Sequence, residues 1–162
     1  EWCFGNGVVL DMRHKKQGET ISLLDVQNEL KRIGYHIQPL DIVLIMTGAD
    51  KHWDKKDYLD CHPGMSSQAT LWLISKGVRV MGTDAYGFDQ PFKNMIRDYL
   101  KTGDKNHLWP AHLAGRVKEY AHIEKMANLD AIPEPYGFKI ACFPVKIEGA
   151  SAGWTRAVAM VE

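Results

Sequence analysis

Histidine and carboxylate side chains are the residues of this sequence that could do chemistry. The chain has seven histidines, and several of them lie near acidic residues and glycine-containing turns. Imidazole and carboxylate groups are ligands that divalent cations such as zinc favour. The densest local group brings three imidazoles and one carboxylate into one stretch of chain, namely His107, His112, His122 and Glu124. These residue types indicate a metal site.

The residue types alone do not select the ligands. A single histidine is more often a surface residue or a hydrogen-bonded core residue than a ligand. We predict a helix over residues 116–129, and in that helix His122 and Glu124 would point to different faces. Only one of the two could then face a shared ion. The sequence contains no HExxH, P-loop, GxGxxG or GxSxG motif that would favour another chemistry.

Short apolar runs predict the strands that would position these side chains. Residues 8–12 and 42–46 are apolar and rich in β-branched side chains, which is typical of buried strands, and 78–81 reads as a third strand. Further along, 138–147 and 155–161 predict a strand pair. The small-residue segment 149–153 would join that pair tightly, and its spacing does not match a serine nucleophile turn.

Helix signals lie between these strands. Ser22 followed by Asp25 resembles a capping box, and apolar residues at helical spacing lead to a stop at Gly34. A second helix is expected to begin at Pro63 and to end at Gly77. Because helices and strands alternate, the sequence predicts an α/β fold with parallel strand pairing. The polar and aromatic stretch 98–109 is expected to be a loop.

The composition limits which kinds of binding partner and which cellular compartment are expected. With 45% hydrophobic residues and no linker, the 162 residues are expected to form one domain with a buried core, residues 1–162. Twenty basic residues balance twenty acidic ones without a basic run, which argues against nucleic acid or an anionic membrane as a partner and favours a small-molecule substrate. Three cysteines without a CxxC motif argue against a disulfide framework and favour the cytoplasm. No apolar stretch approaches the ~20 residues of a membrane span.

Seven segments, taken together and in order, resemble the cyclase family of metal-dependent hydrolases, which includes kynurenine formamidase, isatin hydrolase and trans-dienelactone hydrolase. The resemblance covers almost the whole chain, and the joint occurrence of the segments is far more specific than any one of them. The segments are Gly7–His14, Leu40–Asp50, His62–Met65, Gly82–Asp84, His122–Asp130, Cys142–Ile147 and Gly149–Ala159.

The resemblance implies a swivelling β/β/α fold and a zinc or manganese ion that activates water against an amide or lactone carbonyl. It implies His112 and Glu124 as metal ligands, which selects Glu124 over His122. The family's HxGTHxDxPxH segment, with its other ligands and an acid or base histidine, is not in this sequence. Two protein ligands are too few for a catalytic zinc. We therefore expect the C-terminal part of a longer hydrolase domain, whose upstream peptide is cleaved or missing, or a non-catalytic copy.

Four further residues are candidates for the substrate pocket. Asp84 and Asp89 end or follow a predicted strand, where active sites of α/β folds lie, although loop capping would also explain them. Trp154 could approach the pocket or a subunit interface, and Arg156 could pair with a substrate carboxylate or form a structural ion pair. The leading hypothesis is a hydrolase of a cyclic amide, lactone or aryl formamide. The alternatives are a non-catalytic oligomerising or binding module and a metal-storage protein, and family members are commonly homo-oligomers.

Overall fold

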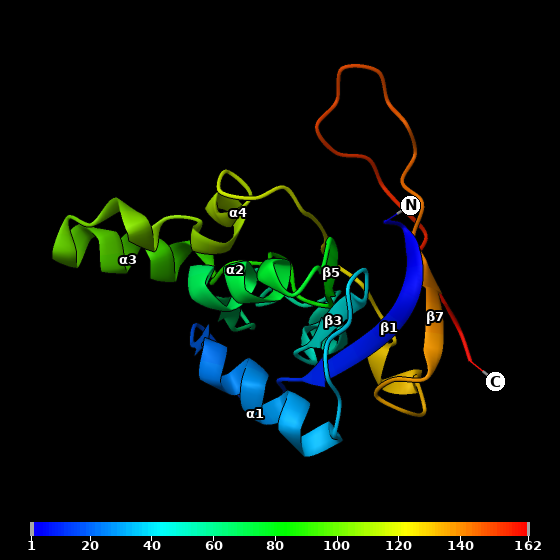
Figure 1. The fold of residues 1–162 in the computed structure, drawn as a ribbon. Helices are drawn as coiled ribbons and strands as arrows, with labels where there is room; N and C mark the ends of the chain where they lie inside the picture. The colour runs from blue at the N-terminus through cyan, green and yellow to red at the C-terminus, as the bar shows by residue number, and fades with distance from the viewer. Residues whose placement is uncertain (1, 162) are drawn as a thin grey trace.

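The computed structural model describes residues 2–161 and has a six-stranded mixed sheet at its centre (Figure 1). In chain order the elements are β1 (Phe4–Asp11), β2 (Thr20–Ile21), α1 (Leu23–Ile33), β3 (Ile42–Met46), η1 (Ala49–His52), β4 (Gly64–Met65), α2 (Ser67–Ser75), β5 (Val80–Thr83), α3 (Phe92–Thr102), η2 (Lys105–His107), α4 (Pro110–Ala114), β6 (Ala121–Ile123), η3 (Leu129–Ala131), β7 (Phe138–Ala141) and β8 (Val158–Met160).

The large sheet has the strand order β6-β5-β3-β1-β7-β8, and β2 and β4 form a separate parallel pair. The first four of these strands run parallel to their neighbours, whereas β7 is antiparallel to β1 and β8 is antiparallel to β7. The predicted strands at 8–12, 42–46 and 78–81 are confirmed as β1, β3 and β5, with β1 beginning earlier, at Phe4. The prediction of an α/β fold with parallel pairing is confirmed.

The capping box of α1 is present. The Ser22 hydroxyl accepts a hydrogen bond from the Asp25 amide at 3.2 Å, and the Asp25 carboxylate accepts one from the Ser22 amide at 2.7 Å. Gly34 ends the helix in the left-handed region, with φ of 70°. Both ends of this helix are therefore fixed by the residues that the sequence pattern identified.

The two faces of the sheet are covered differently. Helices α1 and α2 lie on one face (Figure 1), where they bury alternate residues of the central strands such as Val8, Leu10, Val43 and Ile45. On the other face, Leu44 and Val9 belong to one apolar cluster with Leu129 of η3 and Phe138 of β7. The sheet is thus buried on both sides, as expected for parallel strands.

One predicted helix boundary and one predicted loop are wrong. Pro63 does not open a helix but precedes β4, and α2 begins at Ser67 with Ser66 as its cap, because the Ser66 hydroxyl accepts from the Ala69 amide at 3.1 Å. The loop expected over 98–109 is instead the end of α3, followed by η2. The apolar residues of α3 recur at helical spacing, so the sequence carried a signal for this helix that the loop prediction overlooked; they are Phe92, Met95, Ile96, Tyr99 and Leu100.

The helix predicted over 116–129 is also wrong. This stretch contains β6, whose residues pair in parallel with β5 in the register Met81↔His122 and Gly82↔Ile123. The hydrogen bonds of this strand come from a partner about 40 residues earlier in the chain, as the numbering of the paired residues shows. The spacing of residues within 116–129 carries no information about such a distant partner. For this reason the apolar residues of that stretch resembled one face of a helix.

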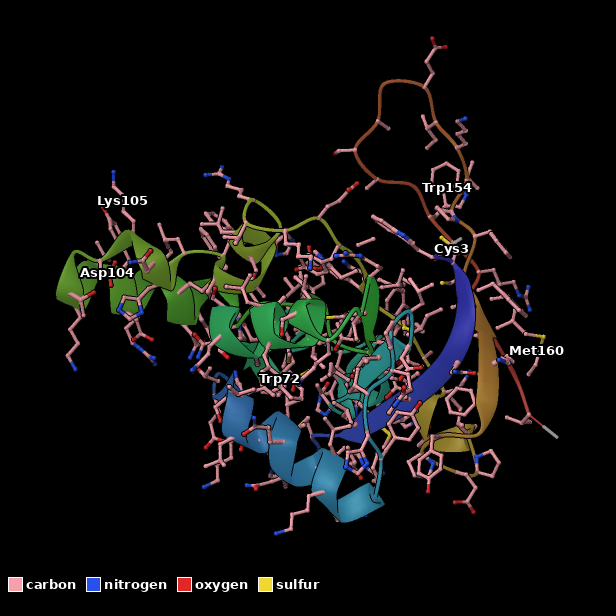
Figure 2. The ribbon with its side chains drawn as sticks, in the orientation of Figure 1. Cys3, Trp72, Asp104, Lys105, Trp154 and Met160 are labelled. Atoms are coloured by element: carbon pink, nitrogen blue, oxygen red, sulfur yellow. The ribbon has the colours of Figure 1, made fainter. Side chains whose placement is uncertain are left out.

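The pairing of β7 with β8 is confirmed, but the connection between them is not tight. Residues 142–157 form an arm that projects from the end of the sheet (Figure 1), with one isolated bridge between Pro144 and Thr155. Trp154 lies on this arm (Figure 2), with 74% of its surface exposed. We call residues 142–157 the arm.

Two further expectations can be compared with the structure. Cys3, Cys61 and Cys142 all have free thiols, in agreement with the absence of a disulfide framework. Within residues 2–161, none of the helices has the length and apolar character that crossing a membrane requires.

Candidate metal centre

Three side chains with metal-binding groups meet at one edge of the sheet. His112 comes from α4, His122 from β6, and Glu124 follows β6 directly. The Nε2 atoms of His112 and His122 lie 3.8 and 3.4 Å from Oε1 of Glu124, and one ligand atom from each residue lies within 4.8 Å of the other two. Zinc–ligand bonds of about 2.0–2.2 Å place the ligands of one ion roughly 3–4 Å apart, so a small contraction would let these atoms share a cation.

The parallel pairing of β5 and β6 explains why these groups meet. Parallel strands end at the same edge, and β5 leads into Asp89 while β6 leads into Glu124. Active-site groups of α/β folds commonly lie at this carboxyl end of the strands. The His122 ring stacks on Phe88, with centroids 5.0 Å apart, and meets the His112 ring edge-on at 4.4 Å. Packing therefore fixes the orientation of His122.

Asp89 positions His112. Its buried carboxylate accepts hydrogen bonds from the amide of Ala111 at 2.5 Å and from the amide of His112 at 3.4 Å, and it also binds Nδ1 of His112. This contact leaves Nε2 of His112 free for a cation, an arrangement that metal-ligating histidines commonly show. The hydrogen bond with Asp89 is the main reason why the pKa of His112 is raised above its usual value.

Glu124 is held as a carboxylate. Burial by itself would raise its pKa, but hydrogen bonds with His122 and from the Phe88 amide outweigh burial and lower the pKa to about 2. The Phe88 amide donates to Oε1 at 3.0 Å, and Nζ of Lys125 lies 3.3 Å from Oε2. The side chain is therefore ionised at neutral pH, which is the form that binds a metal.

A cavity of about 530 Å³ opens onto Asp89, His112 and Glu124. Its walls combine polar side chains with aromatic and apolar ones, and the polar ones are Asp60, His62, Asp89, Gln90, Lys93, His112 and Glu124. The apolar part of the lining is made of Leu59, Tyr86, Phe92, Met95 and Trp109. A mostly apolar wall with a few convergent polar groups is typical of a small-molecule site.

Of the residues that the sequence singled out, His112, Glu124 and Asp89 are brought together. The argument that His122 and Glu124 must face apart is wrong, because it assumed a helix. Residues two apart in and just after a strand lie on the same side, and the two side chains are 3.4 Å apart. His107, in η2, is not part of the group.

Asp84 has a different environment. Its carboxylate accepts hydrogen bonds from the amide and hydroxyl of Thr47 at 2.8 and 2.6 Å and from the amide of Gly48 at 2.7 Å. It lines a separate cavity of about 90 Å³ with Asp50 and Asp130. Burial raises its pKa against these hydrogen bonds. Asp84 therefore ties the ends of β3 and β5 together, which is the loop-capping role that the sequence left open.

Trp154 and Arg156 are not brought to the metal centre. Trp154 lies on the arm, and its carbonyl accepts a hydrogen bond from the Val145 amide at 3.0 Å. Arg156 lines another cavity, of about 340 Å³, together with Leu44 and Val158. Within residues 2–161, neither side chain lines the cavity beside His112.

The sequence did not identify two further histidines of this region, His122 of the metal-binding group and His62 of the cavity wall. The wrong helix assignment excluded His122, although a histidine and a glutamate two apart around Ile123 are also compatible with a strand. His62 belongs to the segment His62–Met65 that carries the cyclase resemblance, and no role was predicted for it. It is 1% exposed, and local sequence carries no signal that a loop histidine will be buried beside a site more than 40 residues away.

A family model described as "Putative cyclase" matches residues 1–90. The match ends before His112, His122 and Glu124. No protein in the curated collection of sequences matches this chain.

Solved structures match nearly the whole chain. An isatin hydrolase bound to the product analogue thioisatinate aligns with a TM-score of 0.83, at 21% identity, over 99% of this chain and 61% of its own. Isatin hydrolase A from Labrenzia aggregata, bound to benzyl benzoate, aligns with a TM-score of 0.78, at 23% identity, over 99% and 62%. A structure described as a potential metal-dependent hydrolase with cyclase activity aligns with a TM-score of 0.66, at 20% identity, over 96% and 64%. The chain thus spans about three fifths of the length of these proteins, and they share its fold.

Proposed function

This chain belongs to the cyclase family, and on that premise we propose that it is part of a metal-dependent hydrolase acting on a cyclic amide, a lactone or an aryl formamide. The observation that supports the proposal most is the convergence of His112 Nε2, His122 Nε2 and Glu124 Oε1 within 4.8 Å of one another. The similarity in fold to isatin hydrolases and to a potential metal-dependent hydrolase agrees with it.

The donor set fits zinc or manganese. Two imidazoles and one carboxylate are a combination that catalytic zinc sites use, with a further position left for water or substrate. His122 raises the number of ligands available in this chain from two to three, which is the number such a site needs. A bound cation of this kind polarises a carbonyl oxygen and lowers the pKa of water to about 7.

The chain's own residues prepare the site in three ways. Asp89 fixes the His112 ring so that Nε2 faces Glu124. Glu124 supplies a negative charge that burial alone would oppose. The aromatic side chains of Tyr86, Phe92 and Trp109 provide flat apolar walls on which an aromatic or cyclic substrate can pack.

We propose that the group that transfers the proton lies outside these 162 residues. The cyclase resemblance places an acid or base histidine in the HxGTHxDxPxH segment, which this sequence lacks. The chain spans 61% of the length of the first isatin hydrolase. We therefore propose that efficient turnover needs a segment in addition to these 162 residues, whereas metal binding does not.

The test measures metal binding and hydrolysis in separate experiments. The chain is stripped with a chelator, reconstituted with zinc or manganese, and its metal content is measured by plasma mass spectrometry. Hydrolysis is then followed on a lactam, a lactone and an aryl formamide, with the chain alone and with the longer native protein. About one equivalent of metal, and metal-dependent hydrolysis by the longer protein, would support the proposal. A longer protein that binds metal and hydrolyses none of the three would contradict it.

A non-catalytic oligomerising or binding module is the second candidate. The observation that favours it is the exposed apolar surface of β8 and the arm, where Trp154 is 74% exposed, Phe143 64% and Val158 45%. Such surfaces commonly mark contacts with another protein. This candidate predicts a metal-free protein whose mass in solution rises with concentration, even when the longer native chain is used. Homo-oligomerisation and location in the cytoplasm stay predictions.

A further inference from the structure

Cys3 and Cys142 lie directly opposite one another at one end of the sheet. The antiparallel register of β1 and β7 pairs Phe4 with Ala141, so the next pair outward is Cys3 with Cys142. The Cys142 amide donates a hydrogen bond to the Cys3 carbonyl at 2.8 Å, which continues the pairing by one step. Figure 2 shows Cys3 at the start of β1, beside the arm. The two cysteines are therefore cross-strand neighbours, although they are 139 positions apart in the sequence.

Their side chains lie on the same face of the sheet. Residues directly opposite one another in an antiparallel pair share a face. Alternate residues of a strand point the same way, so Cys142 follows Phe138 and Ile140 onto one face. Cys142 is 2% exposed in the apolar cluster of that face, and the partly buried Cys3 packs against the same cluster. Sγ of Cys142 lies 3.5 Å from the Cys3 carbonyl oxygen.

The two thiols lie within reach of each other and differ in accessibility. Burial raises the pKa of Cys142 to about 11, and the adjacent Cys3 thiol adds to this rise. Cys142 is therefore protonated at neutral pH and protected from reagents in solution, whereas Cys3 is partly exposed. The third cysteine, Cys61, belongs to a separate apolar cluster around Tyr58. The pair thus combines one accessible thiol with one protected thiol.

The backbone around this pair is suited to a disulfide. The Cα atoms of disulfide-bonded cysteines lie about 4.4–6.8 Å apart, and opposite residues of antiparallel strands have Cα atoms about 4.5–5.5 Å apart. Their Cβ atoms lie about 4.5–5.5 Å apart in a sheet, whereas a disulfide needs about 3.5–4.5 Å. Cys3 lies in the turn before β1, so a small movement of this residue can close the difference while the register from Phe4 to Gly7 is kept.

We propose that Cys3 and Cys142 are a redox-sensitive pair, whose reversible disulfide fastens the start of β1 to the root of the arm. Cys142 is the first residue of the arm, and beyond it only an isolated bridge between Pro144 and Thr155 joins the two sides of the arm as strands are joined. The inference does not rest on the proposed function. The pair lies at the amino end of β1, whereas the candidate metal centre follows the carboxyl ends of the parallel strands β5 and β6.

A low-molecular-weight disulfide, such as glutathione disulfide, is the oxidant. The Cys3 thiolate attacks one of its sulfur atoms, which forms a mixed disulfide and releases one glutathione thiolate. The Cys142 thiolate then attacks the Cys3 sulfur and releases the second glutathione. Two protein thiols are oxidised to one disulfide, and glutathione disulfide is reduced to two glutathione molecules, which take up the two cysteine protons. A dithiol such as dithiothreitol reverses the reaction.

The test oxidises the Cys61→Ser variant, in which this pair supplies all the thiols. The chain is incubated with glutathione disulfide, and its intact mass and its thiol content after unfolding are measured. The mass should fall by two hydrogen atoms, without bound glutathione, and both thiols should disappear. Because the closed loop spans 139 positions, oxidation should raise the melting temperature by about 5–15 °C, and dithiothreitol should reverse this rise. Peptide mapping of the wild type locates the same bond without any substitution.

Two further variants in the Cys61→Ser background test the order of the steps. Cys142→Ser should retain one glutathione on Cys3, because no second thiol can release it, and its melting temperature should not rise. Cys3→Ser should leave the buried Cys142 unmodified over the same time. A chain that keeps both thiols, links to a second chain or carries glutathione on each cysteine would overturn the proposal. A disulfide that forms without raising the melting temperature would overturn its role as a fastening.

Discussion

The buried carboxylate of Asp89 binds Nδ1 of His112, and Nε2 of the same ring lies 3.8 Å from Oε1 of Glu124. One carboxylate therefore orients the imidazole and a second lies where a cation would be shared. Asp89 also accepts hydrogen bonds from the amides of Ala111 and His112 at the start of α4, so it fixes the ring and its backbone together. The proposed metal centre would depend on this contact as much as on its ligands.

Replacing Asp89 should weaken metal binding without unfolding the chain. Asp89→Asn keeps the size of the side chain but removes its charge, and loss of such a partner typically lowers metal affinity about 10- to 100-fold. Zinc affinity by competition with a chromophoric chelator measures this. Asp84→Asn is the matched control, because Asp84 is also a buried acceptor that follows β5. That variant should lose roughly 1–3 kcal/mol of stability and keep its affinity for zinc. Equal losses of affinity in both variants would contradict the assignment.

Removing His122 should abolish stoichiometric metal binding by the isolated chain. The variant keeps only two ligands, which is fewer than a catalytic zinc site uses. Metal content after gel filtration should fall from about one equivalent to well below one half in His122→Ala. His107→Ala provides the control, since His107 lies in η2 and outside the group of three. If His122→Ala retained a full equivalent, the ligands would have to be sought elsewhere.

Acid should remove a stabilising contribution of Glu124 from the metal-free protein. The pKa of Glu124 is lowered from 4.5 to about 2, so the folded state binds this proton less readily than the unfolded state does. The resulting stability is fully present above the unfolded pKa and is lost as the pH falls through the folded pKa. Urea unfolding of the wild type and of Glu124→Gln should therefore differ most above about pH 5, and the difference should shrink towards pH 2. A difference that grows with acidity would reverse the sign and refute this account.

The capping box of α1 should contribute measurably to stability. Ser22→Ala removes the hydroxyl that accepts from the Asp25 amide, and the loss of such a cap costs about 0.5–2 kcal/mol. The free energy of unfolding in urea measures it. Ser151→Ala changes the same residue type at an exposed position of the arm and should leave that free energy within about 0.5 kcal/mol.

Local patterns were sufficient for the elements that carry their own signals. The helix from Leu23 to Ile33 has its cap, its apolar stripe and its glycine stop in adjacent residues, and the strand from Ile42 to Met46 is apolar throughout. The helix α3 also carries such a signal, since its apolar residues recur at helical spacing from Phe92 to Leu100, and the loop prediction overlooked it. By contrast, β6 receives its hydrogen bonds from β5, and its three residues have no local pattern that distinguishes a strand from a helix.

The candidate site was predictable only in part. The cyclase resemblance led to His112 and Glu124, and the position of Asp89 after a strand led to the pocket wall. His122 could not be chosen while its stretch was read as a helix, because the direction of a side chain depends on the secondary structure assigned to it. The placement of His62 depends on contacts between β4 and the loop around Gln90, which lie far apart in the sequence.

The position of β1 in the sheet has a consequence for synthesis on the ribosome. This strand is made first among the described elements, and one of its edges pairs with β3 soon afterwards. Its other edge pairs with β7, whose residues 138–141 emerge from the exit tunnel only after most of the chain. During that interval the nascent protein carries an open β-edge, which other chains can join. Slowing translation between β6 and β7 should therefore increase co-translational aggregation. Binding of a ribosome-associated chaperone to β1 should suppress that aggregation.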